Sequence, residues 1–342
     1  MNRKKIRIAV IGAGAVTPHH IKAWQQIPQA EVVAICRRDV ANDRQLASRF
    51  NLFSTTDYDD LLNDPDIDAV DITLPSGLHA EFGVKAAEAG KHIIVEKPID
   101  VSIKKADALI EACDRAGVTL AVISQYRFMD PVLRMYDIVK KGQLGDLLQG
   151  DAYIKWYRSQ EYYDSGAWRG TWELDGGGPF MNQGIHFIDL LLSVMGPVKW
   201  VFAKTRTTIH NIEVEDIGMA MVEFDSGAFG VIQASTAVFP GLPARLEIHG
   251  TDGTISIEGE KLGFLHIKGQ KPEKGRDISA SGAASPMSID VTPFVREFDD
   301  IISAITHRRA PLVSGTEARR SLRLILAVYE SAKTGRPVAP GA

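Results

Sequence analysis

The fold of this chain is decided by a stretch near its start, Ile6-Arg7-Ile8-Ala9-Val10-Ile11-Gly12-Ala13-Gly14-Ala15-Val16. Apolar, mostly branched residues run directly into a Gly-x-Gly turn, and an amphipathic segment with Ile21, Trp24 and Ile27 follows. The pattern predicts a strand, a tight turn and a helix. Such a turn lets the backbone approach a pyrophosphate, and the helix amino terminus offers free N–H groups and the positive end of its dipole. We expect a dinucleotide-binding unit; the alternative is an ordinary turn without a ligand.

The residues of this turn that we expect to contact the cofactor are Gly12, Gly14, Ala15 and Val16. Thr17-Pro18 stands where a third glycine or alanine is usual. Proline suits the first turn of a helix, so the stretch is interpreted as a variant of the glycine turn.

Composition limits the class of protein. The length of 342 residues favours about two domains. With 45% hydrophobic and 24% charged residues, the chain is typical of soluble globular proteins, and its net charge of −4 argues against nucleic acid or an anionic membrane as partner. No apolar run approaches a membrane span, and no small-residue cleavage site follows the basic start. Cys36 and Cys113 offer neither a disulfide framework nor metal spacing. We expect a cytoplasmic protein without a metal site.

Strand and helix patterns alternate through the first third of the chain. This alternation predicts a doubly wound parallel sheet, an α/β Rossmann domain over residues 1–123. After the first strand, further strands are predicted over 31–36, 69–74, 92–95 and 118–123, and helices near 40–50, 57–63, 79–89 and 102–116.

Several candidate binding residues lie together at the predicted carboxyl ends of these strands, where such sheets bind ligands. They are Gly12, Arg37, Pro75-Ser76 and Glu96-Lys97. An acidic residue usually follows the second strand and holds the ribose hydroxyl, whereas an arginine there accommodates a 2′-phosphate. Arg37 occupies that position with Arg38 beside it, which favours NADP(H) over NAD(H). The alternatives are a solvated basic loop or an arginine stacked on the adenine.

The pattern changes after residue 123. Hairpin-type turns at Asp225-Ser226-Gly227 and Thr251-Asp252-Gly253 join strand-like segments. Residues 124–342 are therefore predicted to form an α+β domain for substrate binding and oligomerisation, with a large, mostly antiparallel open sheet. Its strands are predicted near 147–157, 198–209, 214–224, 228–238, 243–249, 253–258 and 261–267, with a helix over 179–195, a mobile loop over 270–290, and closing helices over 292–307 and 316–333 that could pack back on the first domain.

Lys97 is the first candidate for chemistry. It follows an apolar strand, and Pro98 favours an extended backbone before it. A lysine beside a nicotinamide could stabilise a developing alkoxide, or transfer a proton if nearby cations and burial lower its pKa. The alternative is a surface Glu–Lys pair at a strand end.

Asn182, His186 and Asp189 form a second candidate. Their spacing of four and three residues places them on one face of the predicted helix. In a catalytic interpretation His186 is the general base, Asn182 binds substrate, and Asp189 orients the imidazole ring. The alternative is a satisfied polar pair at a domain junction. No second histidine or cysteine has metal-ligand spacing on this helix, so zinc is not proposed.

Other residues are weaker candidates. Tyr126 and Arg127 follow the last parallel strand and could reach the site. Aromatic and arginine side chains further on suit a sugar-binding lip or, equally, a packed linker between domains. They are Trp156, Tyr162, Tyr163, Trp168, Arg169 and Trp172. His19 and His20 are expected to be packing or solvated residues of the first helix.

Together these motifs resemble the Gfo/Idh/MocA oxidoreductase family, named for glucose–fructose oxidoreductase and inositol dehydrogenase. The resemblance covers essentially the whole chain, and Glu96-Lys97-Pro98 preceded by Ala89-Gly90-Lys91-His92 is its most specific part. The other matching motifs are Gly12-x-Gly14 with His20, Thr73-Leu74-Pro75 with His79, Arg127-Phe128, Gly145, Gly176-Gly177-Gly178 to His186-x-x-Asp189, and Ser331-Ala332-x-Thr334-Gly335-Arg336.

The resemblance implies that Lys97 and His186 are the catalytic pair and that hydride passes between a substrate carbon and nicotinamide C4. Many relatives carry Asp where this chain has Asn182, and an amide can only orient. The implied cofactor contacts are Thr73, Leu74, Pro75, Ser76, His79, Glu96, Lys97 and Gln125, with Trp168 and Arg169 from the second domain; the implied substrate contacts are Lys97, Tyr126, Arg127, Tyr163, Asn182 and His186.

The sequence therefore predicts an NAD(P)-dependent dehydrogenase that acts on a hydroxyl of a sugar, sugar derivative or cyclic polyol. The family usually forms dimers or tetramers through the open face of the second sheet, and an apolar open face needs such a cover. Two alternatives stay open: an NAD-dependent glycosidase of the same fold, and a non-catalytic dinucleotide-binding regulator.

Overall fold

The computed structural model describes residues 5–37, 46–275 and 290–341. These residues form two compact units: unit 1 lies within 1–125 and 285–319, and unit 2 within 126–284 and 320–342. Arg38, the first part of the helix predicted over 40–50, and most of the loop predicted over 270–290 lie outside the described residues.

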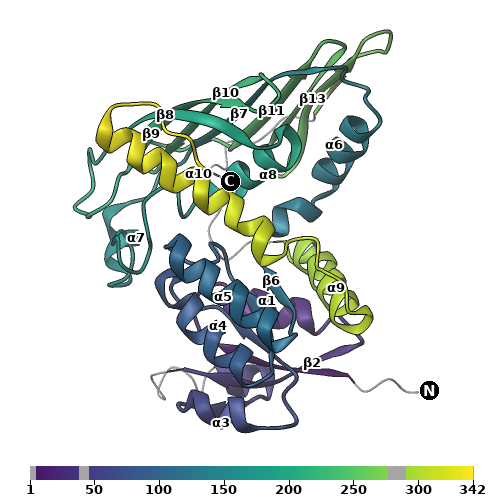
Figure 1. The fold of residues 1–342 in the computed structure, drawn as a ribbon, viewed down its shortest axis with the longest axis vertical. Helices are drawn as coiled ribbons and strands as arrows, with labels where there is room; N and C mark the ends of the chain where they lie inside the picture. The colour runs from purple at the N-terminus through teal and green to yellow at the C-terminus, as the bar shows by residue number, and fades with distance from the viewer. Residues whose placement is uncertain (1–4, 38–45, 276–289, 342) are drawn as a thin grey trace. The chain divides into compact units, whose positions relative to one another are not determined.

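Unit 1 is built on a six-stranded sheet in the order β3-β2-β1-β4-β5-β6, with every neighbouring pair parallel (Figure 1). The order reverses at β1, which pairs with β2 on one side and β4 on the other. This confirms the predicted doubly wound sheet; the short strand β3 was not among the predicted strands. The strands are β1 (Ile6–Ile11), β2 (Ala30–Cys36), β3 (Phe53–Thr55), β4 (Ala69–Ile72), β5 (His92–Val95) and β6 (Leu120–Val122).

Helices flank this sheet, and local sequence signals explain their ends. Asp57 caps α3 by accepting the N–H of Asp59, and Gly117 ends α5 in the left-handed conformation. Within the described residues, the α-helices of unit 1 with both ends described are α1 (Thr17–Trp24), α3 (Tyr58–Asn63), α4 (His79–Glu88), α5 (Ile103–Ala116) and α9 (Thr292–His307). Residues 46–50, the described end of the helix predicted over 40–50, are helical as well.

The core of unit 1 joins the start of the chain to a helix far along it. Phe294 and Phe298 of α9 are fully buried with Ile8 of β1 and Trp24 of α1. The rings of Trp24 and Phe298 stack with centroids 3.8 Å apart and an interplanar angle of 14°. Because aromatic side chains bury a large apolar area, this contact fixes α9 on α1.

Unit 2 is built on an eight-stranded sheet in the order β14-β13-β12-β11-β7-β10-β9-β8 (Figure 1). All of its neighbouring pairs are antiparallel except β7 and β10, which confirms the predicted, mostly antiparallel sheet. The strands are β7 (Leu147–Lys155), β8 (Val198–Arg206), β9 (Ile217–Phe224), β10 (Phe229–Ser235), β11 (Arg245–Gly250), β12 (Gly253–Glu258), β13 (Lys261–Ile267) and β14 (Glu273–Lys274).

The two faces of this sheet differ. Along β9, Gly218, Ala220, Val222 and Phe224 are buried, whereas the intervening Met219 and Met221 are exposed. Alternation of this kind marks a sheet with one covered face. The covered face carries α8 (Ile185–Met195), which packs against β7 and β11.

Three helical features of unit 2 differ from the prediction. Two helices, α6 (Asp130–Lys140) and α7 (Gln160–Asp164), were not predicted. The signal for α6 was present, because Pro131 at its first turn is followed by buried residues at Val132, Met135 and Ile138. The helix predicted over 179–195 begins only at Ile185.

The late start of α8 has a tertiary cause. The carboxylate of Glu215, just before β9, accepts the N–H groups of Gly178 and Phe180 at 3.0 and 3.2 Å. Gly184 donates to the carbonyl of Pro179, a five-residue spacing that does not belong to an α-helix. Residues 179–184 therefore form turns.

The helix α10 (Gly315–Thr334) runs from the end of unit 1 into unit 2. None of the helices in the described ranges combines the length and the apolarity that a membrane span requires.

Candidate active site

The glycine turn between β1 and α1 is held by two threonines. Gly12 has a φ of +111°, and a Cβ at this position would lie 2.9 Å from the carbonyl of Thr73. The hydroxyl of Thr17 lies 2.8 Å from that of Thr73 and 3.4 Å from the carbonyl oxygen of Gly12. Thr17 therefore ties this turn to the end of β4. Gly14 and Ala15 at the apex of the turn are exposed.

The predicted cofactor residues of unit 1 follow the strands at one edge of the sheet. Ile11 of β1 is level with Ile72 of β4, and Ile72 with Val95 of β5. Parallel strands end at the same edge, so the residues that follow them are neighbours. These residues are Gly12, Gly14, Ala15 and Val16 after β1, Arg37 after β2, Thr73, Leu74, Pro75 and Ser76 after β4, Glu96 and Lys97 after β5, and Gln125 after β6.

His79 connects the loops after β4 and β5. Its Nδ1 lies 2.7 Å from the carbonyl oxygen of Pro98, and its Nε2 lies 2.8 Å from that of Leu74. Burial lowers the pKa of the imidazole, although both carbonyls favour its charged form. Both ring nitrogens thus face the backbone of the loops on which the predicted cofactor contacts lie.

Behind Lys97 lies a buried group of charged side chains. His20 of α1, Asp71 of β4 and Glu96 after β5 are 0%, 0% and 8% exposed. The Nδ1 of His20 lies 2.9 Å from Asp71 Oδ2, and its Nε2 lies 3.0 Å from Glu96 Oε1. We call these three residues the buried trio.

The sequence predicts a packing or solvated role for His20; the structure confirms the packing, excludes the solvated alternative and adds a carboxylate partner at each ring nitrogen. Two signals could have indicated it. Asp71 is a charged residue within the apolar strand Ala69–Ile72, and His20 lies four residues before Trp24, on the same face of α1. The indole N–H of Trp24 also donates to Asp71 Oδ2, at 2.8 Å.

Unit 2 brings together two of the predicted substrate residues. The ring of Tyr126 stacks on that of His186, with centroids 4.6 Å apart and an interplanar angle of 21°. His186 is the second residue of α8 and is half-buried. Burial raises the pKa of the Tyr126 hydroxyl to about 12, so this side chain is a neutral hydrogen-bonding group near neutral pH.

Asn182 does not share a helical face with His186, because it lies in the turn before α8. Its amide nitrogen donates to Asp175 Oδ1 at 2.7 Å, and Asp175 Oδ2 accepts the N–H of Gly170 at 2.9 Å. Asp175 is 3% exposed. A buried carboxylate therefore fixes which way the Asn182 amide is turned.

Arg127 and Asp189 form an ion pair with each other. The guanidinium donates from Nε to Oδ2 and from Nη2 to Oδ1, both at 2.6 Å, and the residues are 5% and 4% exposed. Ser321 of α10 adds a hydrogen bond to Asp189 Oδ1 at 3.1 Å. The arrangement holds α8 to the segment after Tyr126.

The aromatic segment forms a stack with two arginines. The guanidinium of Arg169 lies 4.3 Å from the ring centroid of Tyr162 and 4.5 Å from that of Trp168. Arg158 lies on Tyr162 and Trp156 at 5.3 and 5.2 Å. These are cation–π distances, and they hold the side chains in place.

Two other aromatic residues of this segment have protein partners. Tyr163 is 5% exposed, and its hydroxyl lies 2.7 Å from that of Thr236. The indole N–H of Trp172 donates to the carbonyl of Glu213 at 3.1 Å.

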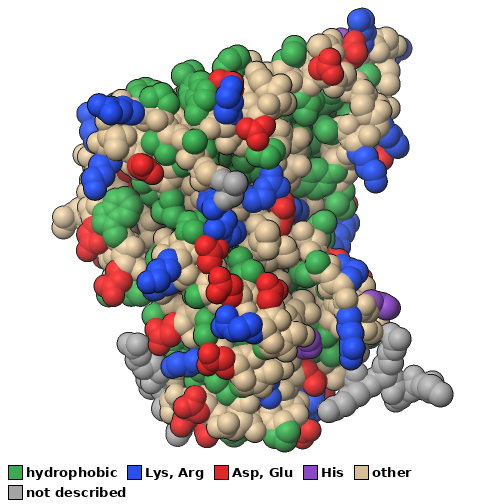
Figure 2. All heavy atoms as spheres, in the orientation of Figure 1, with side chains coloured by type: hydrophobic (Ala, Val, Ile, Leu, Met, Phe, Trp, Pro, Cys, Tyr) green, Lys and Arg blue, Asp and Glu red, His purple; other side chains and the backbone are tan. Residues whose placement is uncertain are grey.

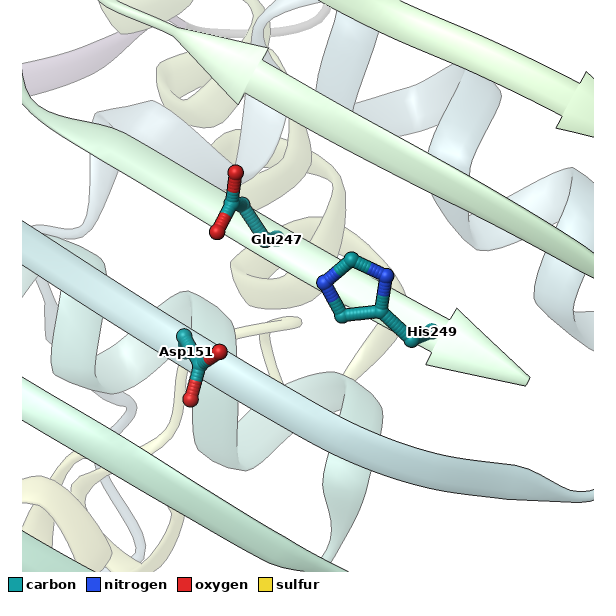
Figure 3. Close-up of side chains that lie close together, drawn as sticks. All are labelled: Asp151, Glu247 and His249. Carbon is teal, nitrogen blue, oxygen red and sulfur yellow. The ribbon is translucent and has the colours of Figure 1, made fainter.

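A separate cluster lies on β7 and β11, where Figure 3 shows Asp151, Glu247 and His249 on adjacent strands. One ligand atom from each lies within 4.8 Å of the others, which would suit a metal ion. The side chains also have protein partners, so we interpret them as a polar patch of the sheet. These partners are Gln149 and Val231 for Asp151, Arg245 for Glu247, and Thr254 for His249.

Charges are mixed over the face in Figure 2, where Lys and Arg side chains alternate with Asp and Glu. This mixing fits the small net charge of −4. Fields from interspersed charges of both signs largely cancel at a distance.

Comparison with known proteins gives a consistent result. A model for the Gfo/Idh/MocA oxidoreductase family, described as an NAD-binding Rossmann fold, matches residues 6–124, and one for the C-terminal domain of that family matches 132–256. The uncharacterized oxidoreductase YrbE of Bacillus subtilis is 31% identical over 75% of this chain and 75% of its own. The scyllo-inositol 2-dehydrogenase (NAD(+)) of the same organism is 27% identical over 98% of this chain and 96% of its own.

A solved structure agrees with these matches. The crystal structure of the WlbA dehydrogenase from Bordetella pertussis, in complex with NADH and UDP-GlcNAcA, superposes with a TM-score of 0.89. It is 30% identical to this chain, and the alignment covers 99% of each.

We predict that the Arg127–Asp189 pair contributes strongly to stability. Removing one partner of a buried pair leaves an uncompensated charge, so Arg127→Met should lower the free energy of unfolding by about 3–5 kcal/mol. Arg127→Met combined with Asp189→Leu should cost less than the sum of the single changes. Urea denaturation of Arg127→Met, of Asp189→Leu and of the double variant measures the three losses of unfolding free energy. The exposed Lys141–Asp137 pair serves as control and should contribute below about 1 kcal/mol. Additive losses at Arg127 and Asp189 would contradict the coupling.

We also predict a pH dependence from Glu215. Burial raises the pKa of its carboxyl from 4.5 to about 7, although the N–H groups of Gly178 and Phe180 favour the charged form. The folded state then holds a proton between these values that the unfolded state has released. The stabilisation that the raised pKa of Glu215 gives to the fold is complete below pH 4.5 and is lost as the pH rises through 7.

Glu215→Gln tests this pH dependence, because the amide keeps the shape of the side chain and one of its two acceptor oxygens but does not titrate. Urea denaturation at pH 5 and at pH 8 should show the wild type losing up to about 3 kcal/mol more than the variant across this interval. Identical pH dependence of the two proteins would show that Glu215 does not titrate there.

Proposed function

The chain belongs to the Gfo/Idh/MocA oxidoreductase family, and on that premise we propose that it is an NAD(P)-dependent dehydrogenase acting on a hydroxyl of a sugar, sugar derivative or cyclic polyol. The observation that carries the proposal is the edge of the parallel sheet where the Gly12 turn, Arg37 and Lys97 all follow strand ends. The relatives support the substrate class, because one is named for scyllo-inositol and another was crystallised with a nucleotide-linked sugar.

The glycine turn fits a dinucleotide. It lies where the strand order reverses, its apex is exposed, and Val16 at the amino terminus of α1 has no side-chain hydrogen bond to cap the helix. We expect Gly12 to Val16 to hold the pyrophosphate and Arg37 to lie on the adenosine side. A basic residue at Arg37 supports NADP(H) over NAD(H). The bound nicotinamide would accept or supply the hydride.

Each candidate catalytic side chain has a proposed task. During oxidation His186 takes the hydroxyl proton, and the ammonium group of Lys97 donates a hydrogen bond to the oxygen as negative charge develops. Asn182 can only orient substrate, because an amide does not exchange a proton near neutral pH. Asp189 is proposed to orient the imidazole ring of His186, and its ion pair with Arg127 fixes its own position on α8. Tyr126, whose ring stacks on that of His186, is a proposed substrate contact beside it in unit 2.

The remaining predicted contacts keep their proposed roles. Trp168 and Arg169, which stack on each other, would cover the cofactor. Arg127 and Tyr163 would line the substrate pocket, where Asp189 holds the guanidinium of Arg127 and Thr236 holds the hydroxyl of Tyr163. Cys36 and Cys113 are buried thiols outside any disulfide, which supports a reducing, cytoplasmic location.

We further propose a homodimer or homotetramer that forms through the open face of the eight-stranded sheet. Met219, Met221 and Phe229 share this face and are 53%, 47% and 54% exposed. Adjacent apolar side chains of this size favour contact with a partner.

Sedimentation velocity tests the assembly. The wild type should sediment as at least two chains, and Met221→Lys should shift it toward the monomer, because a charge on this face opposes its burial. Leu312→Lys, at an exposed position of unit 1, should leave the mass unchanged. A monomeric wild type would contradict the proposal.

Turnover tests the main proposal. We expect absorbance at 340 nm to rise when the protein is mixed with NADP⁺ or NAD⁺ and one member of a panel of inositols, aldoses, anhydrosugars and sugar acids. Lys97→Ala should reduce kcat at least ~100-fold, because a transition-state interaction is lost, while binding of the cofactor is kept. Lys104→Ala, exposed on α5, is the control.

Near-wild-type kcat in Lys97→Ala would contradict the role of Lys97. A preference for NAD⁺ would contradict the inference from Arg37. Turnover of a glycoside without net NADH formation would indicate the glycosidase instead.

A further inference from the structure

The buried trio places three ionisable side chains in a part of unit 1 that solvent hardly reaches. Its members come from three segments that end or begin at the same sheet edge: His20 from the helix after the glycine turn, Asp71 from β4, and Glu96 from the residue after β5. His20 is enclosed by the rings of Phe294 and Phe298, with centroids at 5.1 and 5.3 Å. Water is therefore replaced on this side by aromatic surface.

The protons of the trio can be counted. Each nitrogen of the His20 ring faces a carboxylate oxygen, at 2.9 Å for Asp71 and 3.0 Å for Glu96. With both carboxylates ionised, both nitrogens must carry a hydrogen, so the ring is an imidazolium ion. Burial alone would lower the pKa of His20, but Asp71 and Glu96 outweigh it and raise the pKa to about 10. The ring therefore stays charged at neutral pH.

Burying such a cluster in a core costs free energy of folding. Buried ion groups lose their hydration, and apolar residues of similar volume often stabilise a protein equally well or better. A charged cluster does fix the orientation of its side chains, because each hydrogen bond determines how its partner is turned. In the buried trio, the side chain whose orientation is fixed in this way is that of Glu96.

The two carboxylate oxygens of Glu96 have different partners. Oε1 faces His20, whereas Oε2 accepts the main-chain N–H of Lys97 at 3.0 Å. The imidazolium thus holds one end of the carboxylate, and the other end holds the backbone of Lys97. Asp71 in turn is held by His20 and by the indole of Trp24.

We propose that His20 and Asp71 are positioning residues, which fix the backbone of Lys97 at the end of β5 by orienting the carboxylate of Glu96. The inference rests on the proposed function, since it is the ammonium group of Lys97 whose placement would matter for hydride transfer. A small displacement of a catalytic group is enough to slow a reaction strongly.

Two variants test the proposal. His20→Gln removes the charge and one of the two contacts, and we expect kcat to fall at least ~10-fold while KM and the dissociation constant of NADPH change less than ~3-fold. The matched control is His92→Gln. His92 lies at the opposite end of β5, where its Nδ1 accepts the N–H of Thr119. This control should lose stability without losing kcat.

A double variant separates positioning from general destabilisation. If His20 acts through Glu96, then His20→Gln combined with Glu96→Gln should have the kcat of Glu96→Gln alone. Multiplied losses would instead show that His20 and Glu96 act independently, and they would overturn the proposal. Equal loss of kcat in His20→Gln and His92→Gln would overturn it as well.

A measurement on the protein without substrate keeps the inference separate from the function. In protein labelled with ¹⁵N-lysine, amide hydrogen exchange at Lys97 should be at least ~10-fold faster in His20→Gln than in the wild type, and unchanged in His92→Gln. If no compound of the panel is turned over, the proposed function fails while this exchange rate still decides the contact. Unchanged exchange in His20→Gln overturns the positioning role.

Discussion

The parallel pairing of β1, β4 and β5 is the constraint on which the candidate site of unit 1 depends. Hydrogen bonds between the strands continue one residue past their ends, from the Thr73 N–H to the Ile11 carbonyl and from the Glu96 N–H to the Ile72 carbonyl. These bonds hold the glycine turn, the loop after β4 and Lys97 at one level of one edge. A sheet of this kind can present several polar groups together, because its strands all end on the same side.

Buried carboxylates organise both units. In unit 1, Asp71 and Glu96 hold His20. In unit 2, Asp175, Asp189 and Glu215 hold an amide, a guanidinium and two backbone N–H groups. A buried carboxylate must find donors, and the donors it finds are then fixed. Each unit thus uses buried charge to set the position of segments that carry candidate site residues.

The glycine turn, the alternation of strands and helices and the Glu96-Lys97 strand end could be predicted because their signals are local. Apolar runs, Gly-x-Gly and a charged pair after a strand all lie within a few residues, and the resulting sheet order is the predicted doubly wound one. The hairpin turns of the second sheet follow from equally short patterns. By contrast, α6 was missed although its signals are local, and α8 begins at Ile185 because Glu215 binds the turn before it.

The sequence by itself determined most of the secondary elements, with β3, α6 and α7 as exceptions, together with the parallel and antiparallel character of the two sheets and the edge at which a ligand is expected. Only the tertiary structure decided the partners of the charged residues. Arg127 and Asp189 are 62 residues apart, and His20 and Glu96 are 76 apart. Residue type shows that a buried charge needs a partner, but which partner it meets depends on how distant segments pack, and no local pattern records that.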